Sequence, residues 1–517
     1  MFQFTALPPL SLYVHFPWCV RKCPYCDFNS HAVRGEVPEA RYIDALLADL
    51  EADLPRVWGR PVRSIFLGGG TPSLFSPEAI EQLLAGIRAR VTLAPEAEIT
   101  LEANPGTVET ERFRGYRAAG VNRLSIGIQS FDPEQLQKLG RIHGRDEALA
   151  AAQAARTAGF DNFNLDLMFG LPQQTLDEAL ADVRTALALQ PAHLSVYQLT
   201  LEPNTLFHAQ PPALPDDDEI AAMQEALQAE LAAADFVQYE VSAYTRAAPE
   251  PKYRDAHGRA SVAGGTTPGA TDAHGRASVA GGTTPWMEEV GPRREQRPRT
   301  PGATDAHGRG GKTAPAFVQG RKPHSLTASR SALPPSMAVA GAAAGRRCRH
   351  NLNYWQFGDY LGIGAGAHAK ITDAEGVTRL WKVKQPRDYL ATAGTPAGLG
   401  GEQRPDRDDV AFEFMLNALR LTEGVPAMLF SERTGLDPSC LQKPLTQARA
   451  RGLLEPGHEH FRPTPLGRRF LNELVALFLP EATRKDAQVP RDDCMDAGGR
   501  ATPGAVAEAG GRERPAR

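Results

Sequence analysis

The sequence lacks a hydrophobic run long enough to span a membrane, since no apolar stretch approaches the roughly 20 residues that a membrane helix needs. It also lacks an early apolar segment followed by a small-residue cleavage site, which a secretory signal would show. A large net charge is missing too, because 57 Lys and Arg face 61 Asp and Glu, for a net charge of −4. We therefore expect a soluble cytoplasmic protein whose overall charge indicates no particular partner.

Cysteine is scarce, with six residues in a chain of 517, and three of them stand together at Cys19, Cys23 and Cys26. So few cysteines argue against a disulfide framework and are typical of a reducing compartment. The alternating apolar residues just before them, within 12–16, predict a buried strand. The three thiols therefore lie in a loop that leaves the C-terminal end of a strand, where α/β enzymes hold their active sites.

The spacing CxxxCxxC restricts the metal centre that these thiols can form. Thiolates suit iron–sulfur clusters or zinc, and a structural zinc site needs four ligands. No fourth ligand is obvious, because His15 is too close to the strand and His31 would have to fold back. On a four-iron cluster, three cysteines would leave one iron without a protein ligand and free to bind another molecule.

One segment is basic although the net charge of the whole chain is small. From Pro251 to Arg347 there are 15 Lys and Arg but only 6 Asp and Glu, and the string Asp-Ala-His-Gly-Arg starts at 255, 272 and 305. The segment has few large apolar residues and cannot bury enough surface to offset the entropy of ordering. We expect residues 247–347 to be a disordered low-complexity insertion rather than a nucleic-acid-binding region, and residues 481–517 to be a disordered tail of similar composition.

Between the N-terminus and residue 246, strands and helices alternate at about 30-residue intervals. This rhythm is typical of parallel β-α-β construction. Six such units predict an α/β fold, an incomplete (βα)6 barrel that is TIM-like but open, with residues 348–400 completing it. After the first strand, the expected elements are helix 38–54, strand 64–67, helix 77–90, strand 98–103, helix 109–119, strand 123–128, helix 145–158, strand 162–168, helix 175–189, strand 193–199 and helix 217–234.

Polar residues stand at the ends of these strands, where a parallel barrel has its mouth. They are the Gly68-Gly69-Gly70-Thr71-Pro72 turn, Glu102, Gln129 and Asp166. Glycines let backbone amides approach a charged ligand closely, and a carboxylate in a strand needs a partner. The alternative is that each residue makes a hydrogen bond or salt bridge within the barrel.

The cysteine motif resembles the signature of the radical S-adenosylmethionine (SAM) family. This resemblance implies a [4Fe-4S] cluster on Cys19, Cys23 and Cys26, whose open iron chelates SAM. The strings Gly140–His143 and Asp166–Pro172 resemble the coproporphyrinogen-oxidase-like branch of that family. The branch resemblance implies SAM contacts from Tyr13, Tyr25, Gly69, Gly70, Thr71, Glu102, Gln129, Arg141 and Asp166.

Two members of this branch compete. The oxygen-independent coproporphyrinogen III oxidase carries a fourth cysteine, where this chain has Phe28. The string from Pro17 to His31 and the HNxxYW sequence of residues 350–355 instead resemble the heme chaperone family. That resemblance implies heme as a ligand with His350 in the site, His368 as a second candidate, and transfer of heme to hemoproteins such as those of the respiratory chain. Such a chaperone need not be an enzyme, and a homodimer and peripheral membrane contact are compatible with it.

The motif also has a plainer interpretation, in which His350 caps a turn while Tyr354 and Trp355 pack in the core. The low-complexity insertion stands directly before this motif and could shield or destabilise it, so an inactive product is a third interpretation. A flexible loop adds only about 0.6 kcal/mol of closure entropy for each doubling of its length, so the fold tolerates the insertion.

Residues 401–480 follow a different pattern, with expected helices 411–419, 426–434, 438–451 and 464–478 and a hairpin within 453–463. Helices followed by a hairpin predict a winged-helix-like α+β domain. No stripe of Lys and Arg marks the third helix, so we expect a lid or docking module rather than a nucleic-acid-binding domain.

Overall fold

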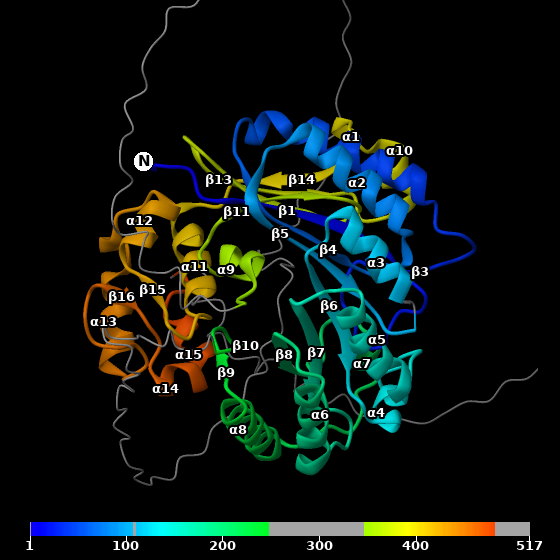
Figure 1. Ribbon diagram of the computed structural model, residues 1–517. Coiled ribbons are helices and arrows are strands. Elements are labelled where there is room, and N and C mark those ends of the chain that lie inside the picture. Colours follow the sequence, from blue (N-terminus) through cyan, green and yellow to red (C-terminus); the bar gives the residue numbers. More distant parts are fainter. Residues whose placement is uncertain (1, 107–109, 248–345, 481–517) are drawn as a thin grey trace, which may run out of the picture.

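The computed structural model describes residues 2–106, 110–247 and 346–480 (Figure 1). The predicted insertion and tail lie outside the described residues, except for 247, 346 and 347. Arg347 is described, and its guanidinium donates to both carboxylate oxygens of Glu423, at 2.9 and 2.7 Å.

One sheet of twelve strands organises most of the fold, in the order β14-β13-β12-β11-β1-β4-β5-β6-β7-β8-β10-β9. Its seven central strands are parallel, and antiparallel strands extend both edges. The end strands β14 and β9 do not pair with each other in the described residues, so the sheet is open and the predicted incomplete barrel is confirmed. The bounds are β11 (Asp359–Ile363), β1 (Leu10–Phe16), β4 (Val62–Gly69), β5 (Leu93–Ala103), β6 (Arg123–Gln129), β7 (Phe163–Phe169), β8 (His193–Gln198), β12 (His368–Asp373), β13 (Gly376–Lys382), β14 (Leu399–Gln403), β10 (Ala243–Arg246) and β9 (Phe236–Gln238).

Helices from the connections between strands cover the outer face of this sheet (Figure 1). Several begin where the sequence supplies a capping side chain, as at Ser76, Thr175 and Asp216. The predicted helices are all present, with ends that differ by a few residues. They are α1 (Glu39–Val57), α2 (Pro77–Arg90), α3 (Thr110–Ala119), α5 (Arg145–Thr157), α6 (Leu176–Ala188) and α8 (Asp217–Ala233), with the shorter α4 (Pro133–Lys138) and α7 (Leu206–Ala209) between them.

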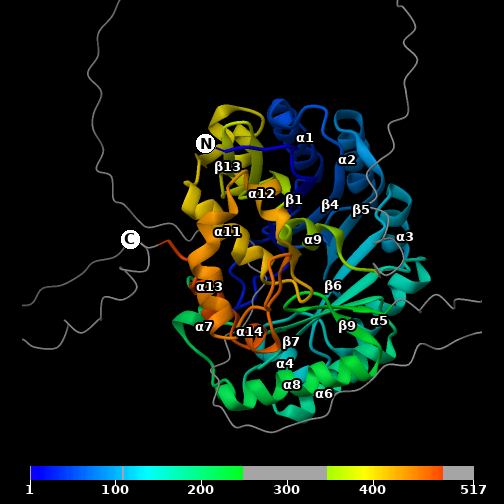
Figure 2. The same cartoon turned by 90° about the vertical axis from the view of Figure 1, so that its left-hand side faces the viewer.

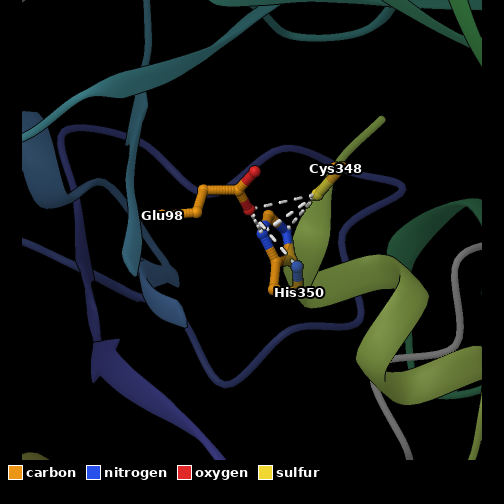
Figure 3. Close-up of side chains that lie close together, drawn as sticks. All are labelled: Glu98, Cys348 and His350. Carbon is orange, nitrogen blue, oxygen red and sulfur yellow. Dashed lines mark hydrogen bonds and ion pairs between the residues drawn. The ribbon is translucent and has the colours of Figure 1, made fainter. Parts of the chain in front are cut away.

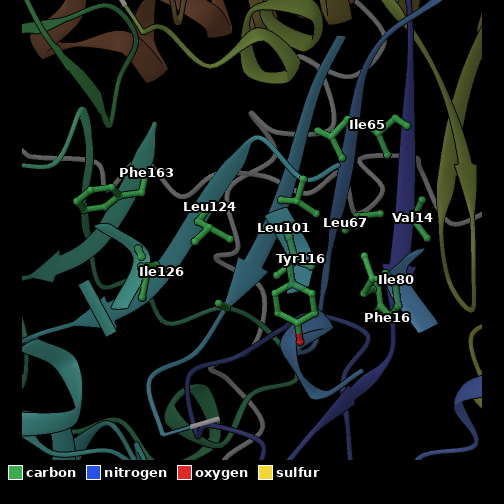
Figure 4. Packing of buried hydrophobic residues seen from close by; sticks show 14 of the residues in the cluster. Val14, Phe16, Ile65, Leu67, Ile80, Leu101, Tyr116, Leu124, Ile126 and Phe163 are labelled. Carbon is green, nitrogen blue, oxygen red and sulfur yellow. The ribbon is translucent and has the colours of Figure 1, made fainter. Parts of the chain in front are cut away.

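The main core lies between the sheet and these helices (Figure 4). Strand side chains alternate between two faces, and the outward ones, such as Val14, Leu67, Leu101 and Ile126, are fully buried against the helices. The intervening residues point to the inner face, and many of them are polar. Alternation therefore builds an apolar shell around a polar interior. The inward residues include Ser64, Glu98, Thr100, Arg123, Ser125, Asn164, Asp166 and His193.

The chain returns to this interior through α9 (Arg349–Trp355), which contacts β1, β4 and β11. In Figure 1, α9 lies between the sheet and the C-terminal helices. The two described sides of the insertion meet at one place, because Tyr239, Ala243 and Cys348 form one buried cluster. The Cys348 amide donates to the Tyr239 hydroxyl at 3.2 Å.

The C-terminal part forms a second core of its own, and Figure 2 shows its helices gathered on one side of the molecule. One expectation for it is wrong, and another is confirmed in part. The predicted helix 464–478 is two helices that meet at Phe470, whose backbone, at φ −112° and ψ 48°, is not helical. The predicted hairpin within 453–463 is short: Leu454 forms an antiparallel bridge with Pro463, and the Glu455 amide donates to the Arg462 carbonyl at 2.9 Å. The strand at 460–461 pairs instead with residues 425–426. The elements are α11 (Arg407–Ala418), β15 (Val425–Pro426), α12 (Met428–Thr434), α13 (Gln442–Ala450), β16 (His460–Phe461), α14 (Pro465–Arg469) and α15 (Leu471–Ala476).

In the part of the chain that the structure describes, every helix is too short or too polar to cross a lipid bilayer.

Candidate functional site

The three predicted cluster cysteines lie in a loop that leaves β1, as the sequence indicated. Short strands β2 (Trp18–Cys19) and β3 (His31–Ala32) pair in parallel and pin the two ends of this loop. The three thiols are half-buried, and all line one cavity of about 230 Å³ inside the barrel. Burial raises the pKa of Cys26 to about 11, so a metal ion would have to displace the proton from this thiol.

The glycine turn at the end of β4 supplies one wall of the same cavity. The Gly70 amide donates to the Phe16 carbonyl at 2.6 Å. A Cβ added to Gly70 would lie 2.5 Å from the Trp18 carbonyl oxygen, and one added to Gly69 would lie 2.5 Å from the His15 ring. Only glycine lets the backbone come this close to the cysteine loop. Thr71 completes the turn, and its hydroxyl donates to the Cys19 sulfur at 3.4 Å.

Two carboxylates face this cavity from neighbouring parts of the sheet. Glu102 accepts a hydrogen bond from the Gly69 amide at 3.0 Å. Its enclosure, and then the nearby Asp166 carboxylate, raise the pKa of Glu102 to about 8. Asp166 accepts from Asn164 at 2.7 Å and from Ser125 at 3.1 Å, while burial raises its pKa. The pair can therefore receive positively charged or hydrogen-bond-donating groups of a ligand.

Arg141 brings the positive charge to this site. Its guanidinium donates to the Asn104 side chain at 2.6 Å and to the Gly127 carbonyl at 2.7 Å, and lies 3.7 Å from the Cys23 sulfur. Its buried Nε has no hydrogen-bond partner among the described residues. Gln129, at the end of β6, lines the cavity and accepts from Tyr197 at 2.7 Å.

The structure brings most of the predicted site residues to this one cavity. Besides the three cysteines, these are Tyr25, Gly69, Gly70, Thr71, Glu102, Gln129, Arg141, Asp166 and His350. Tyr13 differs, because it lies in a neighbouring cavity. There its ring stacks on Phe66 at 5.9 Å, and its hydroxyl pairs with His15 Nδ1 at 2.7 Å.

The first turn of α9 places His350 deep in the barrel, where it is 4% exposed. Its Nδ1 pairs with Glu98 at 2.8 Å, and its ring stacks on Phe66 with centroids 4.2 Å apart. The Cys348 sulfur lies 3.0 Å from the same ring nitrogen. His350 is therefore packed and hydrogen-bonded rather than presented at the surface.

Tyr354 and Trp355 of the HNxxYW segment border the neighbouring cavity, of about 100 Å³. Trp355 also packs in the C-terminal core, as the plainer interpretation expected, and Arg420 lies over its ring at 4.3 Å. His368 borders the same space and stacks on Trp381 at 6.4 Å. This cavity, which we call the aromatic cavity, is lined by Tyr13, His15, Asp27, Phe28, Asn29, Gly69, Tyr354, Trp355, Tyr360, Gly366, His368, Lys384 and Asn417.

Sequence reasoning missed the polar layer deeper in the barrel. This layer contains Glu98, Arg123 and His193. His193 pairs with Asn164 at 2.7 Å and with Tyr239 at 2.9 Å. Glu98 stands four residues before Glu102 on the same strand, so the two share a face. That alternation was the available signal for Glu98.

Comparison with known proteins agrees with this architecture. The sequence pattern of the radical SAM superfamily matches residues 13–186, and that of the HemN C-terminal domain matches residues 406–470. The fold is similar to that of the Escherichia coli coproporphyrinogen III oxidase HemN, a radical SAM enzyme. The TM-score is 0.62 at 20% identity, over 91% of this chain and 90% of that one.

Relatives with higher identity are proteins named heme chaperone HemW. The chain is 42% identical to the Escherichia coli protein over 476 residues, which cover 92% of this chain and 99% of that one. It is 41% identical to the Haemophilus influenzae protein over 480 residues, with the same coverage of both chains. Because the likeness spans these relatives almost from end to end and the cysteine loop and barrel agree with it, the chain belongs to the HemW family of radical SAM proteins.

Proposed function

We propose that this chain is a heme chaperone, which binds heme beside a [4Fe-4S] cluster and passes the heme to hemoproteins. The observation that carries the proposal is the position of α9. This helix, which bears the HNxxYW sequence, lines both the cysteine cavity, through His350, and the aromatic cavity, through Tyr354 and Trp355. Residues of the cysteine loop line both cavities too, so the two proposed cofactors would lie on either side of shared elements.

The residues of the cysteine cavity fit a cluster with SAM. Three thiols on one loop suit three irons of a four-iron cluster, and the glycine turn leaves room against the loop. Glu102 and Asp166 would receive the amino and hydroxyl groups of SAM. Arg141, with its unpartnered Nε, would face an anionic group. A bound cluster would supply the electron for reductive cleavage of SAM.

For heme, His350 and His368 are both candidate iron ligands. Imidazole is a common axial ligand. His350 would have to leave Glu98 and Phe66 to reach heme in the aromatic cavity. His368 already borders that cavity among aromatic rings, with Lys384 as a charge for a propionate. Respiratory hemoproteins as recipients, a homodimer, peripheral membrane contact and a cytoplasmic location belong to the same proposal.

An anaerobic heme titration of the cluster-reconstituted protein tests this. We expect saturable binding near one heme per chain, followed by absorption, and a changed Soret band in whichever of His350→Ala and His368→Ala removes the ligand. His458→Ala, at an exposed histidine of the C-terminal domain, serves as the matched control and should titrate like the unmodified chain.

Binding that never saturates would contradict the chaperone proposal. An assay of coproporphyrinogen turnover would then decide for or against an oxygen-independent coproporphyrinogen III oxidase. Phe28, in place of that enzyme's fourth cysteine, makes us expect no turnover.

A further inference from the structure

Three buried donor side chains lie close together inside the barrel, as Figure 3 shows for Glu98, Cys348 and His350. Glu98 comes from β5, while Cys348 and His350 flank the start of α9. They are 6%, 1% and 4% exposed, respectively. Each offers one ligand atom, and these atoms all lie within 4.8 Å of one another.

The separations are close to those of a tetrahedral metal site. Glu98 Oε1 is 2.8 Å from His350 Nδ1 and 3.7 Å from the Cys348 sulfur, and that sulfur is 3.0 Å from the same nitrogen. Zinc bonds of about 2.0–2.3 Å place neighbouring ligand atoms about 3.3–3.6 Å apart in a tetrahedron. The three atoms would therefore shift by about 0.6 Å or less to accept the ion.

The surroundings bring hydrogen-bond donors and a positive charge to this point. The His350 ring and the Arg349 amide donate to Glu98. A metal ion would have to displace the proton of His350 Nδ1 and that of the Cys348 thiol, whose pKa is raised by burial. The buried Arg123 guanidinium acts on both Glu98 and Cys348 and offsets their negative charge. A divalent ion would balance the charges of one carboxylate and one thiolate, and the Asp166 carboxylate also acts on Arg123.

We propose that Glu98, Cys348 and His350 form a second metal site, for a divalent transition ion of the zinc class. A thiolate combined with an imidazole selects such an ion over magnesium or calcium. Cys348 and His350 also line the cavity, so a fourth coordination position faces it and is open to water or a small ligand. The site is distinct from the cysteine loop, and a metal ion bound to His350 would leave His368 as the heme ligand of the proposed function.

The test uses the full chain with its cluster already reconstituted, so that iron occupies the cysteine loop. The protein receives one equivalent of Zn²⁺ anaerobically and is dialysed, and retained zinc and iron are counted by elemental mass spectrometry. X-ray absorption at the zinc edge then identifies the atoms bound to zinc. We expect about one zinc per chain, bound by one sulfur and by nitrogen and oxygen, with the iron content unchanged.

Cys348→Ser and Glu98→Gln should each weaken zinc retention at least tenfold, and Cys348→Ser should remove the sulfur ligand. Cys440→Ser changes an exposed thiol and is the matched control, which should retain zinc like the unmodified chain. Equal retention in the Cys348 and Cys440 variants would overturn the proposal, and so would a zinc shell of several sulfurs in the unmodified protein. If Cys348→Ser fails to fold, the proposal is tested by the zinc ligands of the unmodified chain and by the zinc retention of Glu98→Gln.

Discussion

Because Gly70 has no side chain, its backbone packs directly against the cysteine loop. Gly70→Ala would force its Cβ against the Phe16 and Trp18 carbonyls, which are backbone atoms and cannot turn away. We expect a loss of about 1–3 kcal/mol of stability, typical of overpacking, and a loss of cluster content after reconstitution. Iron counting and urea unfolding measure the two. Gly144→Ala is the control, since its Cβ would meet only the mobile end of Glu147, and a like effect there would contradict the argument.

Glu102 makes stability depend on pH in the protein without cluster and SAM. Its pKa is raised from 4.5 to about 8 in the fold, so the protonated acid is the form that the fold favours. Stability from this group is complete below about pH 4.5 and is lost as pH rises to about 8, by at most about 5 kcal/mol. Glu102→Gln should flatten this fall, as urea unfolding between pH 5 and 9 would report. An unchanged pH profile would show that Glu102 is ionised already at pH 5.

At the scale of elements, α1 is joined to β13 by buried charges. Lys382 donates to Asp49 and Asp53, at 2.6 Å each, and Tyr389 also donates to Asp49 at 2.7 Å. Lys382→Met would leave two buried carboxylates without their cation, so we expect a loss of about 3–5 kcal/mol in urea unfolding. Arg184→Met breaks the exposed pair with Glu230 and should lower the free energy of unfolding far less than Lys382→Met does. Equal costs would mean that the buried charges do not hold the two elements together.

The same contact shows where sequence reasoning stops. The spacing of Ile43, Leu46 and Leu50 predicts α1 because the helical period is local. Asp49 breaks the apolar face of that helix, and nothing nearby in the sequence explains it, since its partner stands 333 residues away. The cysteine cavity was predictable because parallel strand ends converge by geometry alone. The contact between Glu98 and Cys348 was not predictable, because it depends on how α9 enters the barrel.

At the scale of the whole molecule, the described residues before and after the insertion are in contact, because Tyr239 packs and hydrogen-bonds with Cys348. Replacing residues 248–345 by a flexible linker about a tenth as long should therefore preserve the fold. Closure entropy then favours the shorter chain by about 2 kcal/mol. Thermal unfolding and the heme titration measure the outcome, with the full chain as reference. A lower melting temperature or weaker heme binding would show that the segment contributes to the fold or to the site.

The position of β1 in the sheet affects folding during synthesis, because the two strands that pair with β1 leave the ribosome at different times. β1 pairs with β4, made soon after it, and on its other side with β11, whose first residue is Asp359. Until Asp359 leaves the ribosome, the strand that carries the cysteine loop has one unpaired edge, which can join another nascent chain. At about 5–20 residues per second this interval lasts tens of seconds. Each residue of the insertion lengthens it, so the insertion acts on the yield of folded protein before it can act on the finished site.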